Sequence, residues 1–453
     1  MALAADDAVR RAQAQVHLIR RHQIAAIALV LAAAALAASG FLYGATPDDE
    51  EYRFGLLSAH LHARAWLDGR YLLWTSQLGF GLPQPLGPSV LFHPLLPLLT
   101  VLSVERWTML LLAVHTGVLA ASAWTLGRVL GVSTWGRALL ATTLLLSTPF
   151  QNYALTDFWP TTLLPWTVMP WLLARVLRLC DATARDAWRP ALATGLIGGL
   201  VVANGHPGYV IVFAPAVLVI VAVNARRVMT QWRAWAVLAT VALLVAAPTL
   251  QYLATEFGRF SSSLPRANYG RALALADVPS VFLRPFHEGV SGWLSATHTL
   301  GARTLFFGGP FTVLALIGGA RAAKSRLRLD LAGAALISLL LLATPGLNRI
   351  AVLAGTFAFR DPLILCAAPL AVLMLDALWH RGWRVAATSV GGLQVAVLVL
   401  SAWPFLQDTW ATRQWPLSPG AVADVTPLTA PLVQAIAQQP GRLYLSPEAE
   451  QLV

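Results

Sequence analysis

The chain has 453 residues, of which 57% are hydrophobic and only 12% are charged, whereas roughly a quarter of the residues of an ordinary soluble domain are charged. Together with a mean hydropathy of +0.63, this composition excludes a soluble enzyme and indicates a polytopic membrane protein. The formal charge is +11 and comes from Arg, with a single Lys; we attribute it to membrane topology and expect no nucleic-acid partner. Both cysteines lie at or inside apolar runs, so we expect neither a disulfide nor a zinc site.

Apolar runs of bilayer-crossing length recur along the chain. A bilayer core about 30 Å thick needs roughly 20 apolar residues per helix. The runs lie at 22–43, 107–127, 137–150, 159–179, 190–204, 208–224, 234–253, 304–320, 329–345, 362–379 and 384–403. Two of them, 137–150 and 190–204, are short for a full span. The predicted fold is therefore all-α and polytopic, with about 11 transmembrane helices.

The placement of arginine predicts the orientation of these helices, because short cytoplasmic loops hold the excess of Arg and Lys. If the N-terminus is inside, every inside segment is basic, and these segments hold only six of the 21 acids. We therefore expect a cytoplasmic N-terminus and an extracytoplasmic C-terminus. The first run follows a basic stretch, as in a signal peptide, but it exceeds the usual ~7 to 15 apolar residues, so we expect it to remain as an anchor.

Two loops on the predicted outer face are long, at 44–106 and 254–303, and a polar tail follows the last run. Loops of this length are usually functional or disordered. We therefore divide the chain into a transmembrane domain, 1–403, and an extracytoplasmic tail, 404–453. The active site is expected on the extracytoplasmic face.

The first outer loop begins with four consecutive acids at 48–51. Apolar residues then recur at three- and four-residue intervals, which predicts a juxtamembrane helix lying on the outer leaflet. A turn-rich passage follows at 79–88, and then an apolar segment at about 92–104 with two prolines near its start. Because counting this segment as a span would invert every later basic loop, we expect a short helix that dips into the membrane from outside.

Several short motifs occur along the chain in an order that can be compared with that of known protein families. The acidic cluster is followed by a Gly-Arg-(x)3-Trp passage ending at Trp74 and by Gly-x-Pro at 81–83. Asn-Gly-His-Pro-Gly lies at 204–208, Ser-Leu-Pro-Arg at 263–266 and Phe-Arg-Asp-Pro at 359–362. Together these motifs resemble the first loop and the Gly-His-Pro, Ser-x-x-Arg and Arg-x-Pro elements of bacterial YfhO-like membrane proteins, which belong to the GT-C glycosyltransferases.

The resemblance implies a GT-C-like fold and transfer of a sugar from a polyprenyl phosphate carrier to a cell-envelope glycan or glycolipid. The reaction would take place on the outer face of the cytoplasmic membrane of a bacterium. The implied partners are the lipid-linked sugar, the glycan acceptor and the bilayer. We expect no cofactor, and the clustered acids supply no distant ligand for a divalent cation. Many relatives are longer, so the tail would be the start of a soluble domain cut short, or the chain would be a minimal member of the family.

The acidic cluster is the candidate catalytic site. A sugar hydroxyl is a poor nucleophile near neutral pH and needs a positioned base to take its proton. GT-C enzymes place such a carboxylate in the first outer loop, which implies Asp48 or Asp49, with Asp49 preferred. The alternative is that the four acids solvate the start of a helix and favour its dipole.

Outer arginines are the candidate ligands of the donor phosphate, since arginine suits bidentate phosphate recognition. We select Arg266, Arg303 and Arg360. Arg360 follows an apolar stretch and directly precedes a span, where an isolated charge is costly. Local pairing with Asp361 is the alternative for this residue.

Four further residues are candidates for substrate contact: His206, Asp157, His93 and Trp74. His206 lies at a Gly- and Pro-containing break between two apolar runs, and a structural residue in a tight turn is the alternative. Asp157 could bind a sugar or start a helix, and His93 could face the donor headgroup. Trp74 is the one Trp of the outer loop that we expect to stack on a sugar, because most others lie near span ends as interface anchors.

Two other functions remain open. A lipid-linked glycan transporter would fit the helix break near His206, but nearly all acids lie in loops or at span ends, whereas coupled carriers keep ionisable groups near the midplane. A polysaccharide polymerase or ligase would also act outside and could use outer arginines. For that activity the acidic cluster would be dispensable.

Overall fold

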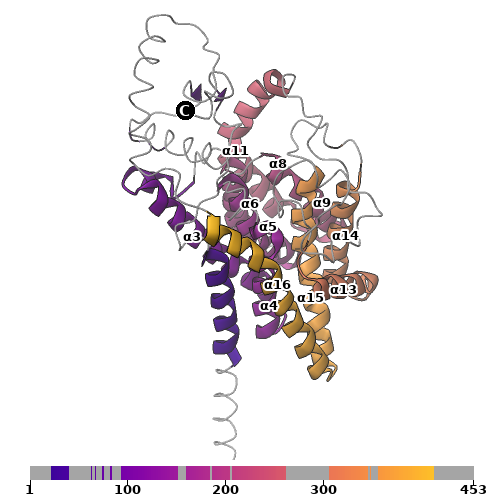
Figure 1. Ribbon diagram of the computed structural model, residues 1–453. Coiled ribbons are helices and arrows are strands. Elements are labelled where there is room, and N and C mark those ends of the chain that lie inside the picture. The colour runs from indigo at the N-terminus through magenta and orange to yellow at the C-terminus, as the bar shows by residue number, and fades with distance from the viewer. Residues whose placement is uncertain are drawn as a thin grey trace, which may run out of the picture.

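The computed structural model describes residues 22–39, 93–151, 160–183, 186–204, 207–261, 306–344 and 356–412, together with 63, 67, 74–75, 82–83 and 347. This part of the chain is helical, apart from two strands of two residues each (Figure 1). The acidic cluster at 48–51, nearly all of the second outer loop and the chain after residue 412 lie outside the described residues.

Each of the eleven predicted apolar runs contains a helix in its described part, which confirms the predicted all-α membrane architecture. The long elements are the helix His22–Ser39, α3 (Val104–Val129), α4 (Thr134–Leu146), α6 (Pro160–Asp181), α7 (Trp188–Asn204), α8 (Pro207–Val210) continuing through η4 (Ile211–Phe213) into α9 (Ala214–Val223), α11 (Trp232–Ser261), α13 (Gly309–Ala320), α14 (Arg326–Leu342), α15 (Arg360–His380) and α16 (Arg384–Thr412). Shorter elements are η2 (Leu96–Thr100), α5 (Thr148–Gln151), α10 (Ala225–Thr230), η6 (Ala322–Lys324) and η8 (Thr356–Phe359).

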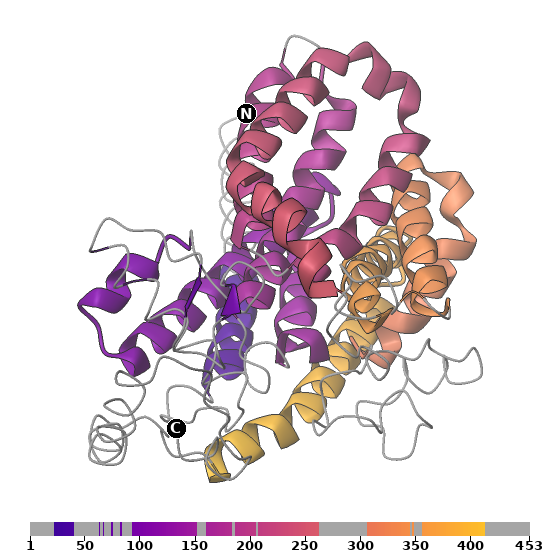
Figure 2. The same cartoon turned by 90° about the horizontal axis from the view of Figure 1, so that it is seen from above.

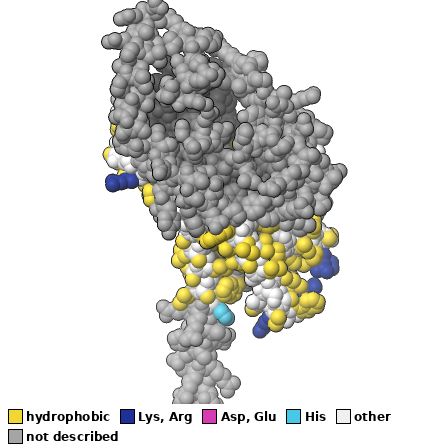
Figure 3. Space-filling model, viewed as in Figure 1, with side chains coloured by type: hydrophobic (Ala, Val, Ile, Leu, Met, Phe, Trp, Pro, Cys, Tyr) yellow, Lys and Arg dark blue, Asp and Glu magenta, His cyan; other side chains and the backbone are white. Residues whose placement is uncertain are grey.

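Six of the described helices are long and apolar enough to cross a membrane: His22–Ser39, Arg106–Val129, Thr162–Asp181, Trp232–Gln251, Arg360–His380 and Arg384–Trp403. The other apolar helices are shorter, and a helix of 12 residues such as α13 extends only about 18 Å at 1.5 Å per residue. Figure 3 shows hydrophobic side chains over the described part of one face, with Lys and Arg at its edges. The chain is a multi-pass membrane protein.

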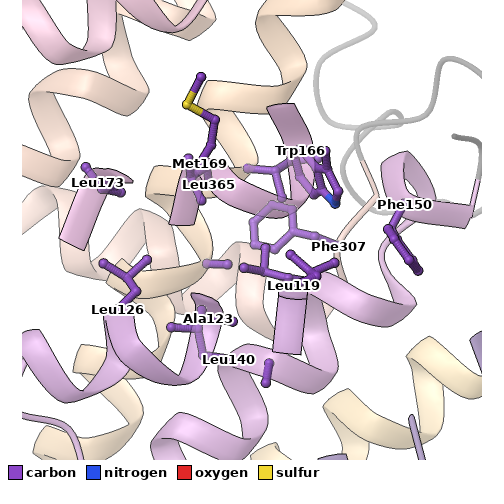
Figure 4. Packing of buried hydrophobic residues seen from close by; sticks show 14 of the residues in the cluster. Leu119, Ala123, Leu126, Leu140, Phe150, Trp166, Met169, Leu173, Phe307 and Leu365 are labelled. Atoms are coloured by element: carbon purple, nitrogen blue, oxygen red, sulfur yellow. The ribbon is translucent and has the colours of Figure 1, made fainter. Parts of the chain in front are cut away.

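The core forms where α3, α4, α6 and α15 meet. Buried side chains from these four helices interlock around Phe307, which lies just before α13 (Figure 4). Helix α15 is buried along most of its length, because it contacts α13, α14, α4 and α16. In Figures 1 and 2 the yellow α16 crosses the other helices obliquely.

The basic loops converge at one end of the bundle. Asp181, the last residue of α6, accepts hydrogen bonds from Arg227 and from Arg326, each at 2.6 Å, so three loops far apart in sequence meet on one carboxylate. Asp376, near the end of α15, accepts from the backbone N–H of Ser133 in the loop between α3 and α4. The sequence predicts that all these loops lie on the same side of the membrane, and the fold brings them together.

A buried amide fixes the backbone where the second outer loop returns to the helices. Gln394 of α16 donates from Nε2 to the carbonyl of Phe307 at 2.7 Å and accepts at Oε1 from the N–H of Phe311 at 3.2 Å. Gly308 between them has a φ of 103°, a conformation that non-glycine residues rarely adopt. A Cβ atom at this position would also collide with the Gln394 amide. The start of α13 is thereby held against α16.

Helices α7 and α11 pack closely because two glycines of α7 face α11. A Cβ atom on Gly195 would lie 2.6 Å from the carbonyl oxygen of Leu238, and one on Gly199 would lie 2.8 Å from that of Ala242. Small residues four apart allow membrane helices to approach at backbone distance. This contact places α7 against α11, the longest described helix.

Gly199→Ala is expected to lower the melting temperature of the purified protein, because the added methyl group forces α7 and α11 apart at a cost of about 1 to 3 kcal/mol. Gly198→Ala is the matched control, since a Cβ atom there meets nothing within 4 Å, and removing a helix-interior glycine should leave stability unchanged or raise it. Equal melting temperatures for the two variants, measured by fluorescence-detected size exclusion after heating, would contradict this packing.

Candidate functional site

The structure describes three of the nine residues predicted for the site: Arg360, His93 and the backbone of Trp74. The remaining six, Asp48, Asp49, Asp157, His206, Arg266 and Arg303, lie outside the described residues, so their predicted roles stay predictions. All three described positions fall in segments that the arginine pattern predicts to lie on the extracytoplasmic side.

Arg360 is the first residue of α15, and its side chain is fully buried, at 0% exposure. Its Nε lies 3.4 Å from Oδ1 of Asp361, which is also buried. This separation is longer than the roughly 2.7 to 2.9 Å of a strong charge-assisted hydrogen bond, so Asp361 is a weak local counter-ion. The guanidinium of Arg360 thus lies at the N-terminus of α15 in a low-dielectric environment, next to the carboxylate of Asp361.

The fold brings two of the sequence motifs together at this position. Helix α8 begins at Pro207, directly after the Gly-His pair, and continues into η4, which contacts both η8 and α15. Element η8 ends at Phe359, next to Arg360. The segment that follows the Gly-His-Pro motif and the segment that precedes the Arg-Asp-Pro motif are about 150 residues apart in sequence, but they are neighbours in space.

A chain of buried polar groups lies inside the bundle near the start of α3. Nε2 of His93 lies 2.9 Å from Nε2 of His115, and Nδ1 of His115 lies 2.8 Å from Oγ1 of Thr167 on α6. His93 and His115 are each 2% exposed. The backbone N–H of Leu95 donates to Nδ1 of His93 at 3.2 Å. The segment after His93 is thus tied to two helices.

The directions of these hydrogen bonds follow from Thr167. Its hydroxyl donates to the carbonyl of Leu163 at 3.0 Å, so its oxygen accepts from Nδ1–H of His115. Nε2 of His115 must then be an acceptor, and His93 donates to it from Nε2–H. Nδ1 of His93 remains an acceptor for Leu95 N–H, as observed. One consistent set of tautomers, with both rings neutral, satisfies every group.

The location of His93 bears on the short helix predicted to dip into the membrane. The described segment from 93 to 100 contains η2, in which Leu96 and Leu99 are buried, and Nε1–H of Trp107 donates to the carbonyl of Leu95 at 2.7 Å. His115 lies three turns into α3, so the segment does turn inward. Both ring nitrogens of His93 bind groups within the protein, which favours a role in positioning this segment, while contact with the donor headgroup stays a prediction.

Replacing His93 by Phe, or His115 by Phe, is expected to destabilise the protein by about 1 to 3 kcal/mol, because each substitution leaves a buried partner without its hydrogen bond. The double variant should cost little more than one single variant, since the two rings belong to one network. Thr116→Val is a matched control, because the Thr116 hydroxyl is buried and has no partner among the described residues. Additive losses in melting temperature would contradict the network.

The same network predicts a pH dependence. Burial lowers the pKa of His93 from 6.5 to about 4. Between these two pH values the unfolded chain binds a proton at His93, whereas the folded chain does not. Stability is therefore lost as the pH falls from about 6.5 towards 4. His93→Phe should flatten this part of the curve, measured as melting temperature against pH, whereas Thr116→Val should leave it unchanged.

Trp74 lies on a short strand in the first outer loop. Strand β1 (Trp74–Thr75) pairs antiparallel with β2 (Leu82–Pro83), and Trp74 is opposite Pro83. The two sequence motifs of this loop are thereby joined in one structural unit. Within the described ranges, no group of three His, Cys, Asp or Glu side chains is arranged as a metal site.

The sequence matches no protein-family model and no curated protein sequence. The structure, in contrast, is similar to solved membrane enzymes. It matches the arabinofuranosyltransferase AftD from Mycobacteria with a TM-score of 0.56 and 20% sequence identity, covering 89% of this chain and 28% of AftD. It matches ArnT from Cupriavidus metallidurans, solved with bound undecaprenyl phosphate, with a TM-score of 0.54 and 14% identity, covering 93% of this chain and 81% of ArnT.

The chain thus spans little more than a quarter of the length of AftD but most of the length of ArnT. In both matches the similarity extends over about nine tenths of this chain, at 89% and 93%. The chain has the fold of the GT-C membrane glycosyltransferases.

Proposed function

We propose that the chain is a glycosyltransferase that moves a sugar from a polyprenyl phosphate carrier to a cell-envelope glycan or glycolipid, and that it belongs to the YfhO-like group of GT-C proteins. The observation that carries the proposal is the fold similarity to ArnT, a protein solved with undecaprenyl phosphate, over 93% of this chain. The fully buried Arg360 at the start of a membrane helix supports it, because a lipid phosphate requires a cation at that depth.

The proposed site faces the outside of the bacterial cytoplasmic membrane. Basic loops that meet on Asp181 define one end of the bundle, and basic loops are typical of the cytoplasmic side. Arg360 begins the helix α15 that ends near Asp376 at the basic end. This supports the proposal that Arg360 lies at the opposite, extracytoplasmic end, and we propose the same side for the loops 44–106 and 254–303 and for the tail 404–453.

In the proposed reaction, the carboxylate of Asp49 or Asp48 takes the proton of the acceptor hydroxyl as its oxygen attacks the anomeric carbon of the donor sugar. The bond between that carbon and the phosphate oxygen breaks, and polyprenyl phosphate leaves with the bonding electron pair. One glycosidic bond forms and one glycosyl phosphate bond breaks. The chemistry requires no redox cofactor, and we propose none.

Arg360 would stabilise the leaving phosphate, because guanidinium groups bind phosphate oxygens in pairs and act most strongly where water is excluded. Arg266 and Arg303 are proposed as further phosphate ligands from the second outer loop. His206 immediately precedes α8, whose continuation η4 contacts α15, so it is proposed to contact substrate next to Arg360. Asp157, just before α6, and Trp74 are proposed as sugar contacts.

Transfer in sealed membrane vesicles tests the proposal. Right-side-out vesicles that contain the protein and radiolabelled polyprenyl phosphate sugars should label a membrane-impermeant glycan extract added outside, whereas inverted vesicles should not. A transporter would move the lipid-linked sugar without making a new glycosidic bond. Labelling only in inverted vesicles, or no labelling with any pentose or hexose donor, would overturn the proposal.

A further inference from the structure

A cavity of about 430 Å³ that is open to the surface lies at the basic end of the bundle, and Arg360 is not among its lining residues. It is formed between the last two turns of α6 and the first turns of α7. Arg175 and Arg178 come from α6 and Arg189 from α7. The remaining lining residues are Asp181, Ala182, Pro190 and Ala193.

The charge of this cavity is strongly unbalanced. Asp181 is its one lining acid, and that carboxylate is already bound by Arg227 and Arg326 from outside the cavity, each at 2.6 Å. Within the described part of the chain, no ion pair joins Arg175, Arg178 or Arg189 to a carboxylate. Three guanidinium groups, of which Arg175 is half-buried and Arg178 and Arg189 are exposed, thus share one cavity with a single carboxylate that two other arginines already bind, although the guanidinium groups repel one another.

Two of these arginines are held in position by aromatic rings. The guanidinium of Arg175 lies 4.6 Å from the ring centre of Trp171, and that of Arg189 lies 5.2 Å from that of Trp188. Such stacking fixes the planar group while its edge remains able to donate hydrogen bonds. The Nε of Arg175 is buried and has no hydrogen-bond partner among the described residues, so one donor is oriented but unused.

The surroundings indicate a membrane lipid rather than a soluble anion. The candidate membrane span of α6 ends at Asp181, so the cavity lies where that helix leaves the bilayer. Trp188 is half exposed, at 51%, and Trp side chains at span ends mark the lipid headgroup region. Ala182, Pro190 and Ala193 provide an apolar wall beside the arginines, as an acyl-glycerol group would require.

We propose that this cavity binds the phosphate headgroup of an anionic phospholipid in the leaflet on the basic side. Arg175, Arg178 and Arg189 would supply the charge-assisted hydrogen bonds, and clusters of arginine between membrane helices are suited to such headgroups. None of the residues proposed for sugar transfer lines this cavity, so the proposed lipid site does not depend on the proposed transfer function.

The test is native mass spectrometry of the full-length protein in detergent with phosphatidylglycerol, phosphatidylcholine and soluble glycerol phosphate. The wild-type protein should retain phosphatidylglycerol at least about tenfold better than phosphatidylcholine. The variant R175Q/R178Q/R189Q should lose this preference. The control variant R321Q/K324Q/R381Q removes three exposed cations at the same end of the bundle and should retain the preference within about twofold.

Two results would overturn the proposal. One is an unchanged lipid preference in the cavity variant. The other is displacement of bound phosphatidylglycerol by equimolar glycerol phosphate, which would identify the site as one for soluble anions. If loss of the Arg175 stacking prevents folding, R178Q/R189Q leaves Arg175 in place and should still reduce the preference about threefold or more; an unchanged preference in that variant would equally overturn the site.

Discussion

Replacing Asp48 and Asp49 together by Asn is expected to lower sugar transfer by about 10² to 10⁴-fold, which is the usual contribution of a positioned general base. The amide group keeps the size and much of the polarity of the side chain but cannot take the proton of the acceptor hydroxyl. The loss should appear in kcat, with the KM of the donor little changed, because the base acts on the acceptor as the new bond forms. We expect a larger loss from Asp49→Asn than from Asp48→Asn.

The neighbouring acids provide the control for this prediction. Glu50→Gln and Glu51→Gln remove one charge each from the same cluster of four, so they test whether net negative charge alone is required. Transfer in these variants should remain within about threefold of the wild type, since we expect these two side chains to be solvated, and a single solvated charge contributes little. If Asp48→Asn, Asp49→Asn and the double variant all transfer sugar at the wild-type rate, the base lies elsewhere.

Replacing Arg360 by Gln is expected to lower kcat/KM for the lipid donor by about 10- to 100-fold, because a hydrogen bond to a charged group contributes roughly 1.5 to 3 kcal/mol. Arg360→Lys should fall between the wild type and Arg360→Gln, since Lys keeps the charge but loses the planar pair of donors. Both variants should bind polyprenyl phosphate more weakly, as measured by native mass spectrometry.

A purely structural role for Arg360 predicts a different outcome. Its side chain is fully buried beside Asp361, and removal of one member of a buried pair can destabilise a protein strongly. Melting temperatures therefore have to be measured in parallel, together with Asp361→Asn and with Arg384→Gln, which removes an exposed cation from the other end of the bundle. If Arg360→Lys folds normally and binds polyprenyl phosphate as tightly as the wild type, the assignment to the phosphate is wrong.

The helices were predictable because apolar runs of bilayer length have few alternatives to a helix. The ends of the helices were harder to predict. Helix α11 extends to Ser261 and α16 to Thr412, whereas the apolar runs end at residues 253 and 403. The helix continues past Gly258 in α11 and past Pro404 in α16, and an apolar-length criterion, which follows the membrane, does not register these extensions. The convergence of the basic loops also followed from sequence, since arginine placement is governed by topology.

The buried polar contacts were not predictable, because each joins residues that are far apart in the chain. His115 lies in the middle of an apolar run and was not selected, although an ionisable residue within a span is itself a signal of function or of a buried partner. Its partners His93 and Thr167 come from other elements. Asn224 and Asp330 form a similar buried contact at 2.9 Å between α9 and α14, and Gln394 joins α16 to α13.

The chemical identity of the lipid product tests the proposed reaction most directly. Purified protein in liposomes, given a panel of radiolabelled polyprenyl phosphate sugars and a cell-envelope glycan extract as acceptor, should release one free polyprenyl monophosphate for each sugar transferred, and the Asp48→Asn/Asp49→Asn variant should release almost none. Release of a polyprenyl diphosphate from diphosphate-linked oligosaccharides, with no turnover of any monophosphate donor, would contradict the proposed reaction and indicate a polymerase or ligase.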